Sequence, residues 1–375
     1  MTPPRPRTRR RPREFTSTDV MITVACFVSA LSLCWLVFGR LTGGIGWFGF
    51  GLSVFAAFLA LLFIVTADRL GRSAAADRVV TAAVFTIATV LFIPLVSIVA
   101  YVVWRGFPAL RLHFFTEDQR AITPTMAATA GGGSHAVVGT LEQVGLALLW
   151  SLPIGVCAAV FLNESRSKWR RPVRIFVDAM SGLPSIMAGL FIYAVLILPY
   201  ARKISLFSFN GFMASLALSL TMVPTITRTV EVVLRLVPDG LREASLALGS
   251  SRTRTVWSVV LPTASTGIAT AVVLGVARVV GETAPLLLTS FGYDLMNADP
   301  FHGPQESLPL FVFRNIRKPN EAAIARGFAG ALVLLAVVIV LFVIARIVGR
   351  DRSAKVRRRR RRRSPARLLA SEGAT

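Results

Sequence analysis

The stretch REASLALGSSRTRTVWSVVLPTA, residues 242–264, is a polar interruption between two long apolar runs of the chain. It contains one glutamate and three arginines. Because charged side chains are costly to bury in hydrocarbon, this stretch is expected to lie in water, between two membrane spans. The function of the chain depends on which side of the membrane the stretch occupies and on what it contacts there.

The composition of the whole chain predicts a membrane protein. Of its 375 residues, 54% are hydrophobic and only 16% are charged, whereas about a quarter of the residues of a soluble domain are charged. The three cysteines and three histidines show neither metal-ligand spacing nor a disulfide framework. We therefore expect an all-α polytopic helical bundle with no metal and no cofactor.

Eight apolar segments are long enough to cross a hydrocarbon layer, which requires about 20 residues per helix. The fifth contains Pro184 and the sixth Pro224, and we expect a kink or a break at each proline. The seventh exceeds one crossing, so part of it is expected outside the hydrocarbon. The segments are 20–39, 46–67, 79–104, 136–162, 173–198, 207–230, 257–288 and 324–348.

The lysines and arginines predict the orientation of these spans, because cytoplasmic loops carry an excess of both. With a cytoplasmic N-terminus, the inner segments hold 31 of the 42 basic residues and the outer segments hold 9. Both termini and residues 242–264 are therefore expected in the cytoplasm. The loops 105–135 and 290–323 are expected on the outer side.

This topology divides the chain into four regions. We expect a basic cytoplasmic tail at 1–19, an extra transmembrane hairpin at 20–75, a six-span body at 79–348 and an arginine-rich tail at 349–375. The seven arginines at 357–363 favour a solvated run or one that binds anionic lipid headgroups. Nucleic-acid binding by this run is the alternative.

Residues 238–250 predict a short cytoplasmic helix within the interruption. Pro238 and Asp239 suit its first turn, and Gly249 suits its end. One side is apolar and must pack against the spans or against another protein; it consists of Leu241, Ala244, Ala247 and Leu248.

The same residues carry a resemblance to the permease subunits of ATP-binding-cassette (ABC) importers. The cytoplasmic signature of that family is matched in spacing by Glu243, Ala244, Ser245, Gly249, Val259, Leu261 and Pro262. The departures are serine at the third position and valine for the more usual isoleucine. The resemblance implies that this coupling helix docks into a groove of an ATP-hydrolysing subunit. The alternative is an amphipathic connector that lies on the membrane surface.

Further blocks resemble the phosphate-specific importer permeases, and the PstA type more than the PstC type. They are GETAPLL at 281–287, SGLPSIMAGLF at 181–191, the glycine-rich lead-in and helix at 131–164, and SLPLFVF at 307–313. The resemblance covers roughly residues 80–348, without the N-terminal hairpin or the arginine tail. It implies a type I importer fold in a bacterial cytoplasmic membrane, a pair of ATPase subunits, a second PstC-like permease and an extracytoplasmic phosphate-binding protein.

Phosphate is a strongly hydrated anion, so its path needs positive groups that replace water. Arg278 lies deep in the seventh segment, and Glu282, four residues later, is expected on the same helical face as its ion-pair partner. Arg228 lies near the inner end of the sixth segment, with Glu231 three residues later. For both arginines the alternative is structural: a packing ion pair for Arg278, and a side chain that reaches the membrane interface for Arg228.

The chain contains no G-x-x-x-x-G-K-[ST] sequence, so ATP binding through a P-loop is excluded. It also offers no Ser/His/Asp set or carboxylate pair that would make it an enzyme. A permease for another oxyanion or small solute remains an alternative. A membrane-anchored protein that binds nucleic acid or lipid through its arginine tail is a second one.

Overall fold

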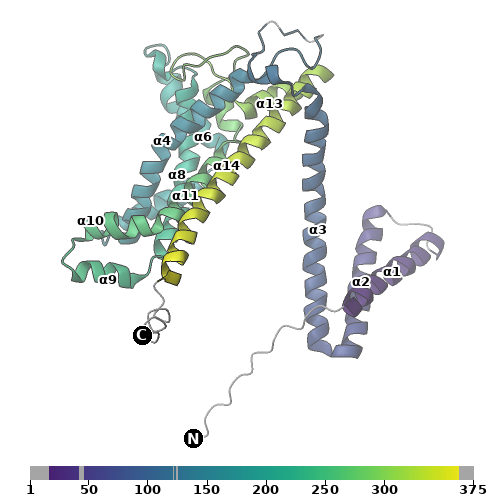
Figure 1. Ribbon diagram of the computed structural model, residues 1–375. Coiled ribbons are helices and arrows are strands. Elements are labelled where there is room, and N and C mark those ends of the chain that lie inside the picture. Colours follow the sequence, from purple (N-terminus) through teal and green to yellow (C-terminus); the bar gives the residue numbers. More distant parts are fainter. Residues whose placement is uncertain (1–16, 42–45, 121, 124–125, 363–375) are drawn as a thin grey trace, which may run out of the picture. The chain divides into compact units, whose positions relative to one another are not determined.

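The computed structural model describes residues 17–41, 46–120, 122–123 and 126–362. In these ranges the chain is helical and contains no strand, which confirms the all-α prediction. It forms two compact units, residues 1–99 and 100–375 (Figure 1). Most of the tail predicted at 1–19 and the end of the arginine-rich tail lie outside the described residues.

Seven helices of the described ranges are long and apolar enough to span a membrane, and a bent helix pair makes up to eight. This agrees with the eight segments expected from the sequence. The seven run over Ser17–Arg40 (α1 and its last turn), Trp47–Leu70 (α2), Arg72–Ala109 (α3, which ends at Gly106, and one further turn), Ser134–Glu164 (α4), Gly211–Arg235 (α8), Arg252–Val279 (α10 and α11) and Glu321–Ile344 (the first part of α14, which ends at Arg362).

The first unit contains α1, α2 and α3 as far as Val99. Cys26 and Ala30 of α1 pack with Phe58 and Leu62 of α2 in a small apolar core. Most other apolar side chains of these helices are exposed, as expected where lipid is the solvent. Asp19, which is 6% exposed, pairs with Arg78 at 2.5 Å and thereby links the start of α1 to α3.

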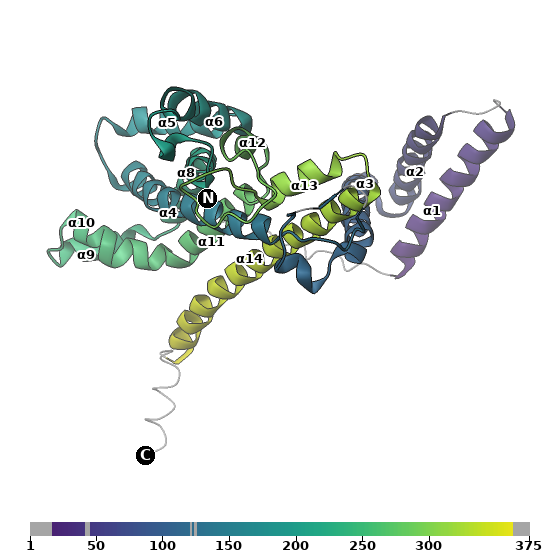
Figure 2. The ribbon, with the colours of Figure 1, turned by 90° about the horizontal axis from the view of Figure 1, so that it is seen from above.

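The second unit is built around α8, which contacts α4 and α11 (Figure 2). It also contacts α5 (Arg170–Ser181), α6 (Ser185–Ile192) and α12 (Ala284–Thr289). Its buried side chains include Leu218, Met222 and Ile226. Gly155 of α4 and Gly275 of α11 both face Ile226, and a Cβ added at either glycine would lie within 2.9 Å of that side chain. Small residues thus let three helices approach closely, as is usual in membrane bundles.

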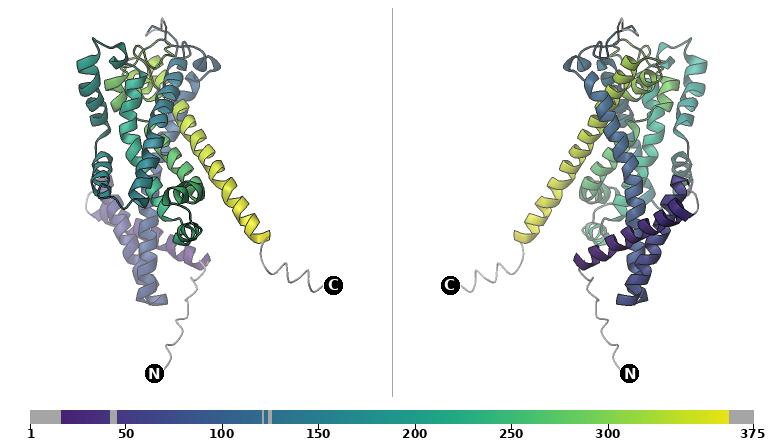
Figure 3. Two further views of the ribbon diagram at one scale, coloured as in Figure 1. Left: turned by 90° about the vertical axis from the view of Figure 1, so that its left-hand side faces the viewer. Right: turned by 90° about the vertical axis from the view of Figure 1, so that its right-hand side faces the viewer.

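The helix α14 packs against α13 (Leu308–Ile316) and α11. Its C-terminal part diverges from the other helices of the unit (Figure 3).

The fifth predicted span is broken at Pro184. The helix α5 (Arg170–Ser181) and the helical run Ser185–Tyr200, which begins with α6 (Ser185–Ile192), meet at 105°. Pro184 cannot donate a backbone hydrogen bond, and it disfavours helical geometry at Leu183. The break expected there is confirmed.

The proline of the sixth span behaves differently. The helix α8 runs through Pro224 without interruption and ends at Arg235, so the span is not broken there, and a kink at Pro224 stays a prediction. Pro224 is buried in the bundle, where contacts with neighbouring helices hold the helix together despite the missing hydrogen bond.

The seventh predicted segment, 257–288, is not one helix. The helix α11 (Leu261–Val279) ends before Gly281, and the short helix α12 (Ala284–Thr289) follows. Pro285 at the start of α12 has no N–H to continue the preceding helix, and its position suits the first turn of a new one.

Candidate substrate cavity and coupling helix

A cavity of about 550 Å³ lies where the broken span meets α8 and α11. All three residues predicted for a substrate path line it: Arg228, Arg278 and Glu282. Ser181, Pro184 and Ser185 from the break between α5 and α6 contribute, together with Thr221, Pro224, Thr225 and Thr229 of α8. The lining is therefore rich in hydroxyl groups and contains two guanidinium groups.

The two interrupted spans meet beside this cavity through α6 and α12. A Cβ added at Gly189 of α6 would lie 2.6 Å from the Pro285 Cα atom and 2.9 Å from its carbonyl oxygen. Only glycine allows this approach without a shift of the backbone. The SGLPSIMAGLF and GETAPLL blocks, far apart in the sequence, therefore form one wall.

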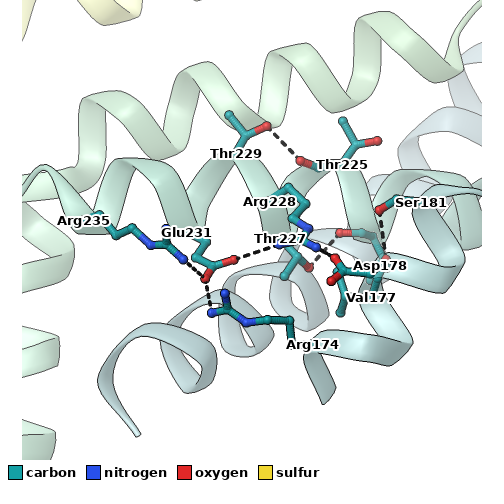
Figure 4. Close-up of polar contacts among 11 residues, drawn as sticks. Arg174, Val177, Asp178, Ser181, Thr225, Thr227, Arg228, Thr229, Glu231 and Arg235 are labelled. Atoms are coloured by element: carbon teal, nitrogen blue, oxygen red, sulfur yellow. Dashed lines mark hydrogen bonds and ion pairs between the residues drawn. The ribbon is translucent and has the colours of Figure 1, made fainter. Parts of the chain in front are cut away.

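Arg228 belongs to a group of alternating charges between α5 and α8 (Figure 4). It pairs with Asp178 of α5 and contacts the Glu231 carboxylate at 3.5 Å, so the expected proximity of Arg228 and Glu231 is present. The Glu231 side chain is only 3% exposed and also pairs with Arg174 at 2.5 Å and Arg235 at 2.6 Å. Three arginines thus surround one buried carboxylate.

Sequence reasoning did not identify Arg174 or Asp178 as members of this group. A signal was present, because the two are spaced i, i+4 on α5 and lie on the polar side of an amphipathic helix. That this side faces Glu231 depends on the bend at Pro184, which turns α5 toward α8.

Arg278 has a different environment from the one predicted. The helix α11 ends at Val279, and Glu282 lies in the turn that follows, with its N–H bonded to the Val279 carbonyl oxygen. The two side chains are therefore not on one helical face, and their expected ion pair is absent from the described residues. The expectation was wrong because Gly281 and Pro285 end the helix between them. Arg278 is exposed and lines the cavity without a carboxylate in salt-bridge range among the described residues.

The short helix expected at 238–250 is present as α9 (Asp239–Ala247), and its coupling role stays a prediction. Gly249 adopts φ +82°, a left-handed conformation that favours glycine and ends the helix as expected. On the predicted apolar side, Leu241 is 42% exposed, Leu248 is 88% exposed, and Ala244 is also exposed. Glu243, beside that side, is exposed as well. This chain therefore leaves that side of the helix uncovered.

Ser245, the departure from the signature, is buried within the chain. Its hydroxyl group forms a 2.9 Å hydrogen bond with the Thr255 hydroxyl group. A buried hydroxyl requires such a partner, so the serine links α9 to the next helix instead of facing a docking surface.

Arg242 holds the coupling helix to the body of the chain, a role that the sequence did not reveal. Its guanidinium group donates to the carbonyl oxygens of Leu234 at 2.9 Å and Val237 at 2.7 Å. It also pairs with Glu164 at 3.0 Å and Asp239 at 2.8 Å. The arginine thereby joins α9 to the ends of α4 and α8.

Leu261 and Pro262 lie inside a helical run that extends from Arg252 to Val279. A proline in a helix loses one hydrogen bond and clashes with the carbonyl group four residues earlier. The π turn Val256–Val260 directly before it widens the helix, and Tyr193–Ile197 does the same before Pro199. One continuous helical run therefore connects the coupling region to Arg278.

A second buried carboxylate, Glu306, lies in the loop before α13. Its side chain is 1% exposed and pairs with Arg314 at 2.5 Å, and Arg314 reaches Asp294 at 3.3 Å. Burial raises the pKa of Glu306 to about 7, against the opposing effect of Arg314. This loop also contacts residues 105–135, because the Met296 N–H donates to the Asp118 carboxylate at 3.0 Å.

Comparison with known proteins identifies the family. Residues 151–354 match the family of binding-protein-dependent transport system inner membrane components. The phosphate transport system permease protein PstA 1 of Mycobacterium tuberculosis is 38% identical over 286 residues, which cover 76% of this chain and 90% of that protein. The chain belongs to the PstA family of phosphate transport permeases. The PstA protein of Yersinia pestis agrees, with 34% identity over 71% of this chain and 88% of its own length.

As a member of this family, the chain is a multi-pass inner-membrane protein and a transport component. Its fold is similar to that of a chain of a bacterial alginate ABC transporter in complex with an alginate-pentasaccharide-bound periplasmic protein. The TM-score is 0.53 at 16% identity, covering 75% of this chain and 97% of that one. A second alginate transporter structure gives a TM-score of 0.50 at the same identity, covering 74% of this chain and 98% of that one. The PstA permease thus has the ABC importer permease fold.

Proposed function

We propose that this PstA-family permease is one membrane subunit of an ATP-driven importer and that inorganic phosphate passes through its cavity. The observation that carries the proposal is the meeting of Arg228 and Arg278 at the junction of two interrupted spans. Relatives named as phosphate transport permeases support phosphate as the cargo.

Arg278 is the better candidate for direct contact with phosphate. An ionisable side chain in a span is costly unless it serves a function, and this one has no ion-paired carboxylate among the described residues. Guanidinium groups bind phosphate oxygens in a bidentate manner. The N-terminus of α6 at Ser185 lines the same cavity, and such helix ends attract anions in transporters built from broken helices.

Energy is proposed to come from a separate pair of ATPase subunits, with this chain itself non-catalytic. With both termini in the cytoplasm, α9 lies on the cytoplasmic side, and Glu243, Ala244 and Gly249 belong to the surface that an ATPase would contact. Ser245 would secure α9 from behind, and Leu261 and Pro262 would carry its movement toward the cavity. Closure of the ATPases would then switch the cavity between outward and inward access.

Two further partners complete the proposal. A second, PstC-like permease would cover the exposed side of the cavity. An extracytoplasmic phosphate-binding protein would deliver phosphate to the loops 105–135 and 290–323. The hairpin predicted at 20–75 has no assigned part in this scheme.

Replacement of Arg278 tests the cargo path. We expect Arg278→Ala to lower the uptake of radiolabelled phosphate by cells at least tenfold, while co-purification of the ATPase is retained. Arg278→Lys should recover part of the uptake, because lysine keeps the positive charge but lacks the guanidinium group that binds two phosphate oxygens at once. Unchanged uptake by Arg278→Ala would refute the role of Arg278.

Replacements in the coupling helix test whether α9 docks on the ATPase. Glu243→Arg and Gly249→Asp should abolish co-purification of the ATPase and uptake together. Glu243→Gln serves as the milder control. If both variants retain the ATPase, α9 is not the docking element.

A further inference from the structure

A second cavity, of about 310 Å³, lies between the end of α4, the start of α5 and the helices α9 and α10 (Arg252–Thr255). It is separate from the cavity that contains Arg278, and the two share no lining residue. Four arginines line it: Arg166, Arg170, Arg242 and Arg252. The only carboxylate among its lining residues is Glu164. In Figure 1, α9 and α10 lie beside the lower end of α4.

The charges of this arginine pocket do not balance. Glu164 is already engaged by Arg242, at 3.0 Å and 3.3 Å, and by the Asn163 amide at 2.8 Å. Arg166, Arg170 and Arg252 are exposed and form no ion pair within the described part of the chain. Three unpaired arginines thus line the pocket, and its one lining carboxylate, Glu164, is already paired with Arg242. Their mutual repulsion is relieved most directly by a bound anion.

We propose that this arginine pocket binds a phosphate group. Guanidinium forks match the geometry of phosphate oxygens, and several arginines around one anion are typical of phosphate recognition. Ser165 also lines the pocket and offers a hydroxyl group beside the arginines. The group belongs either to free inorganic phosphate or to the headgroup of an anionic lipid. The cytoplasmic location of the pocket rests on the proposed orientation of the chain.

A bound phosphate group would link three segments that line this pocket. Arg166 belongs to the connection between α4 and α5, Arg170 begins α5, and Arg252 begins the helical run that leads to Arg278. Arg242 fixes the neighbouring helix α9. Occupancy of the pocket would therefore restrain the coupling helix relative to the first cytoplasmic loop of the six-span body. If the source is free phosphate, imported phosphate would bind from the cytoplasmic side and restrain the coupling helix.

Two variants and two matched controls test the pocket. Arg170→Gln and Arg252→Gln each remove one lining cation. Arg171→Gln and Arg254→Gln remove the same charge one and two residues further along the same helices, at positions that are exposed and do not line the pocket. All four leave Arg228 and Arg278 unchanged, so phosphate bound in the transport path forms a constant background, and failure of the transport proposal would not alter the comparison.

The full-length protein is reconstituted in nanodiscs for two measurements. In the first, nanodiscs of phosphatidylcholine alone are titrated with radiolabelled inorganic phosphate. In the second, nanodiscs of equal parts phosphatidylcholine and phosphatidylglycerol are used without phosphate, and the retained phosphatidylglycerol is counted by native mass spectrometry. Melting temperatures of all variants establish that each protein is folded.

We expect each pocket variant to weaken one of these two binding events about tenfold, with both controls within twofold of the unchanged protein. An effect in the first measurement identifies free phosphate as the source, and an effect in the second identifies the lipid headgroup. Equal effects of variants and controls would refute the pocket. So would loss of ATPase co-purification without any effect on either probe, because the arginines would then belong to the ATPase contact.

Discussion

Arg228 and Arg278 line one cavity, yet their surroundings differ. Arg228 contacts two carboxylates, Asp178 and Glu231, and shares the second with two further arginines. Arg278 lies in the last turn of α11 and has no ion-paired carboxylate among the described residues. One arginine is part of a charge group that joins α5 to α8, and the other is free to meet an anion.

The two environments indicate different roles: the paired Arg228 stabilises the bundle, and the unpaired Arg278 is available to bind an anion in the cavity. A guanidinium group engaged by buried carboxylates gains less from a passing phosphate, because it must first give up existing partners. An unpaired guanidinium group has no such cost. The structural and functional alternatives left open by the sequence therefore divide between the two residues: Arg228 favours the structural one and Arg278 the functional one.

The largest effect is expected where the paired region loses its central carboxylate. Glu231→Gln would leave Arg174, Arg228 and Arg235 close together without the buried charge that holds them. We expect a loss of about 3 kcal/mol in stability, at the lower end for a broken buried ion pair, because the arginines reach solvent. The lowered melting temperature and folded yield of the purified protein would show it.

Glu282→Gln is the control, since Glu282 lines the cavity that Arg228 also lines and pairs with no arginine among the described residues. A change within about 0.5 kcal/mol is expected there. If the two glutamine variants were equally stable, the group around Glu231 would not hold α5 to α8.

Glu306 pairs with one arginine, whereas Glu231 pairs with three, and its protonation should make the stability of the chain depend on pH. Because burial holds the pKa of Glu306 at about 7, above its ordinary value of 4.5, the folded chain binds a proton that the unfolded chain releases. This contribution is complete below pH 4.5 and is lost as the pH rises to about 7. Between pH 5.5 and pH 7 the loss corresponds to about 2 kcal/mol.

The test compares the melting temperature of the unchanged protein with that of Glu306→Gln across this range. The difference between the two should widen as the pH rises from 5.5, because glutamine stays neutral while Glu306 loses its proton, and it should become constant above about pH 7.5. Glu117→Gln, an exposed position in the neighbouring loop, should run parallel to the unchanged protein. A constant difference over the whole range would contradict the buried, protonated state of Glu306.

The sequence predicted well where one local signal dominates. Apolar length marked the spans, Pro184 marked a break, and Pro238 and Gly249 marked the bounds of the coupling helix. It failed where the outcome depends on neighbouring helices. Pro224 looks like Pro184 in the sequence, but the surrounding helices hold α8 together, whereas Pro184 follows Gly182 and Leu183 in an exposed turn.

The pairing of charges was the least predictable part of the site. Helical spacing predicted an ion pair between Arg278 and Glu282, but α11 ends at Val279, between the two residues, and Glu282 lies beyond the helix. Besides a local carboxylate each, Arg228 and Arg242 have partners on α5 and α4 that lie more than forty residues away, as the Asp178 and Glu164 contacts show. No spacing rule within one helix reports on contacts that the bend at Pro184 and the packing of α9 create.

The smallest effect, and the sharpest form of the comparison, is a pair of alanine variants at the two arginines. Arg228→Ala should cost about 1 kcal/mol in stability, since its side chain is 39% exposed and solvent weakens its pairs with Asp178 and Glu231. Arg278→Ala should change stability by less than about 0.5 kcal/mol and still remove uptake. Thermal unfolding of both proteins, measured beside phosphate uptake, separates the two roles. The assignment would be reversed if Arg278→Ala unfolded at the lower temperature while Arg228→Ala alone lost transport, because the free cation would then be structural and the paired one functional.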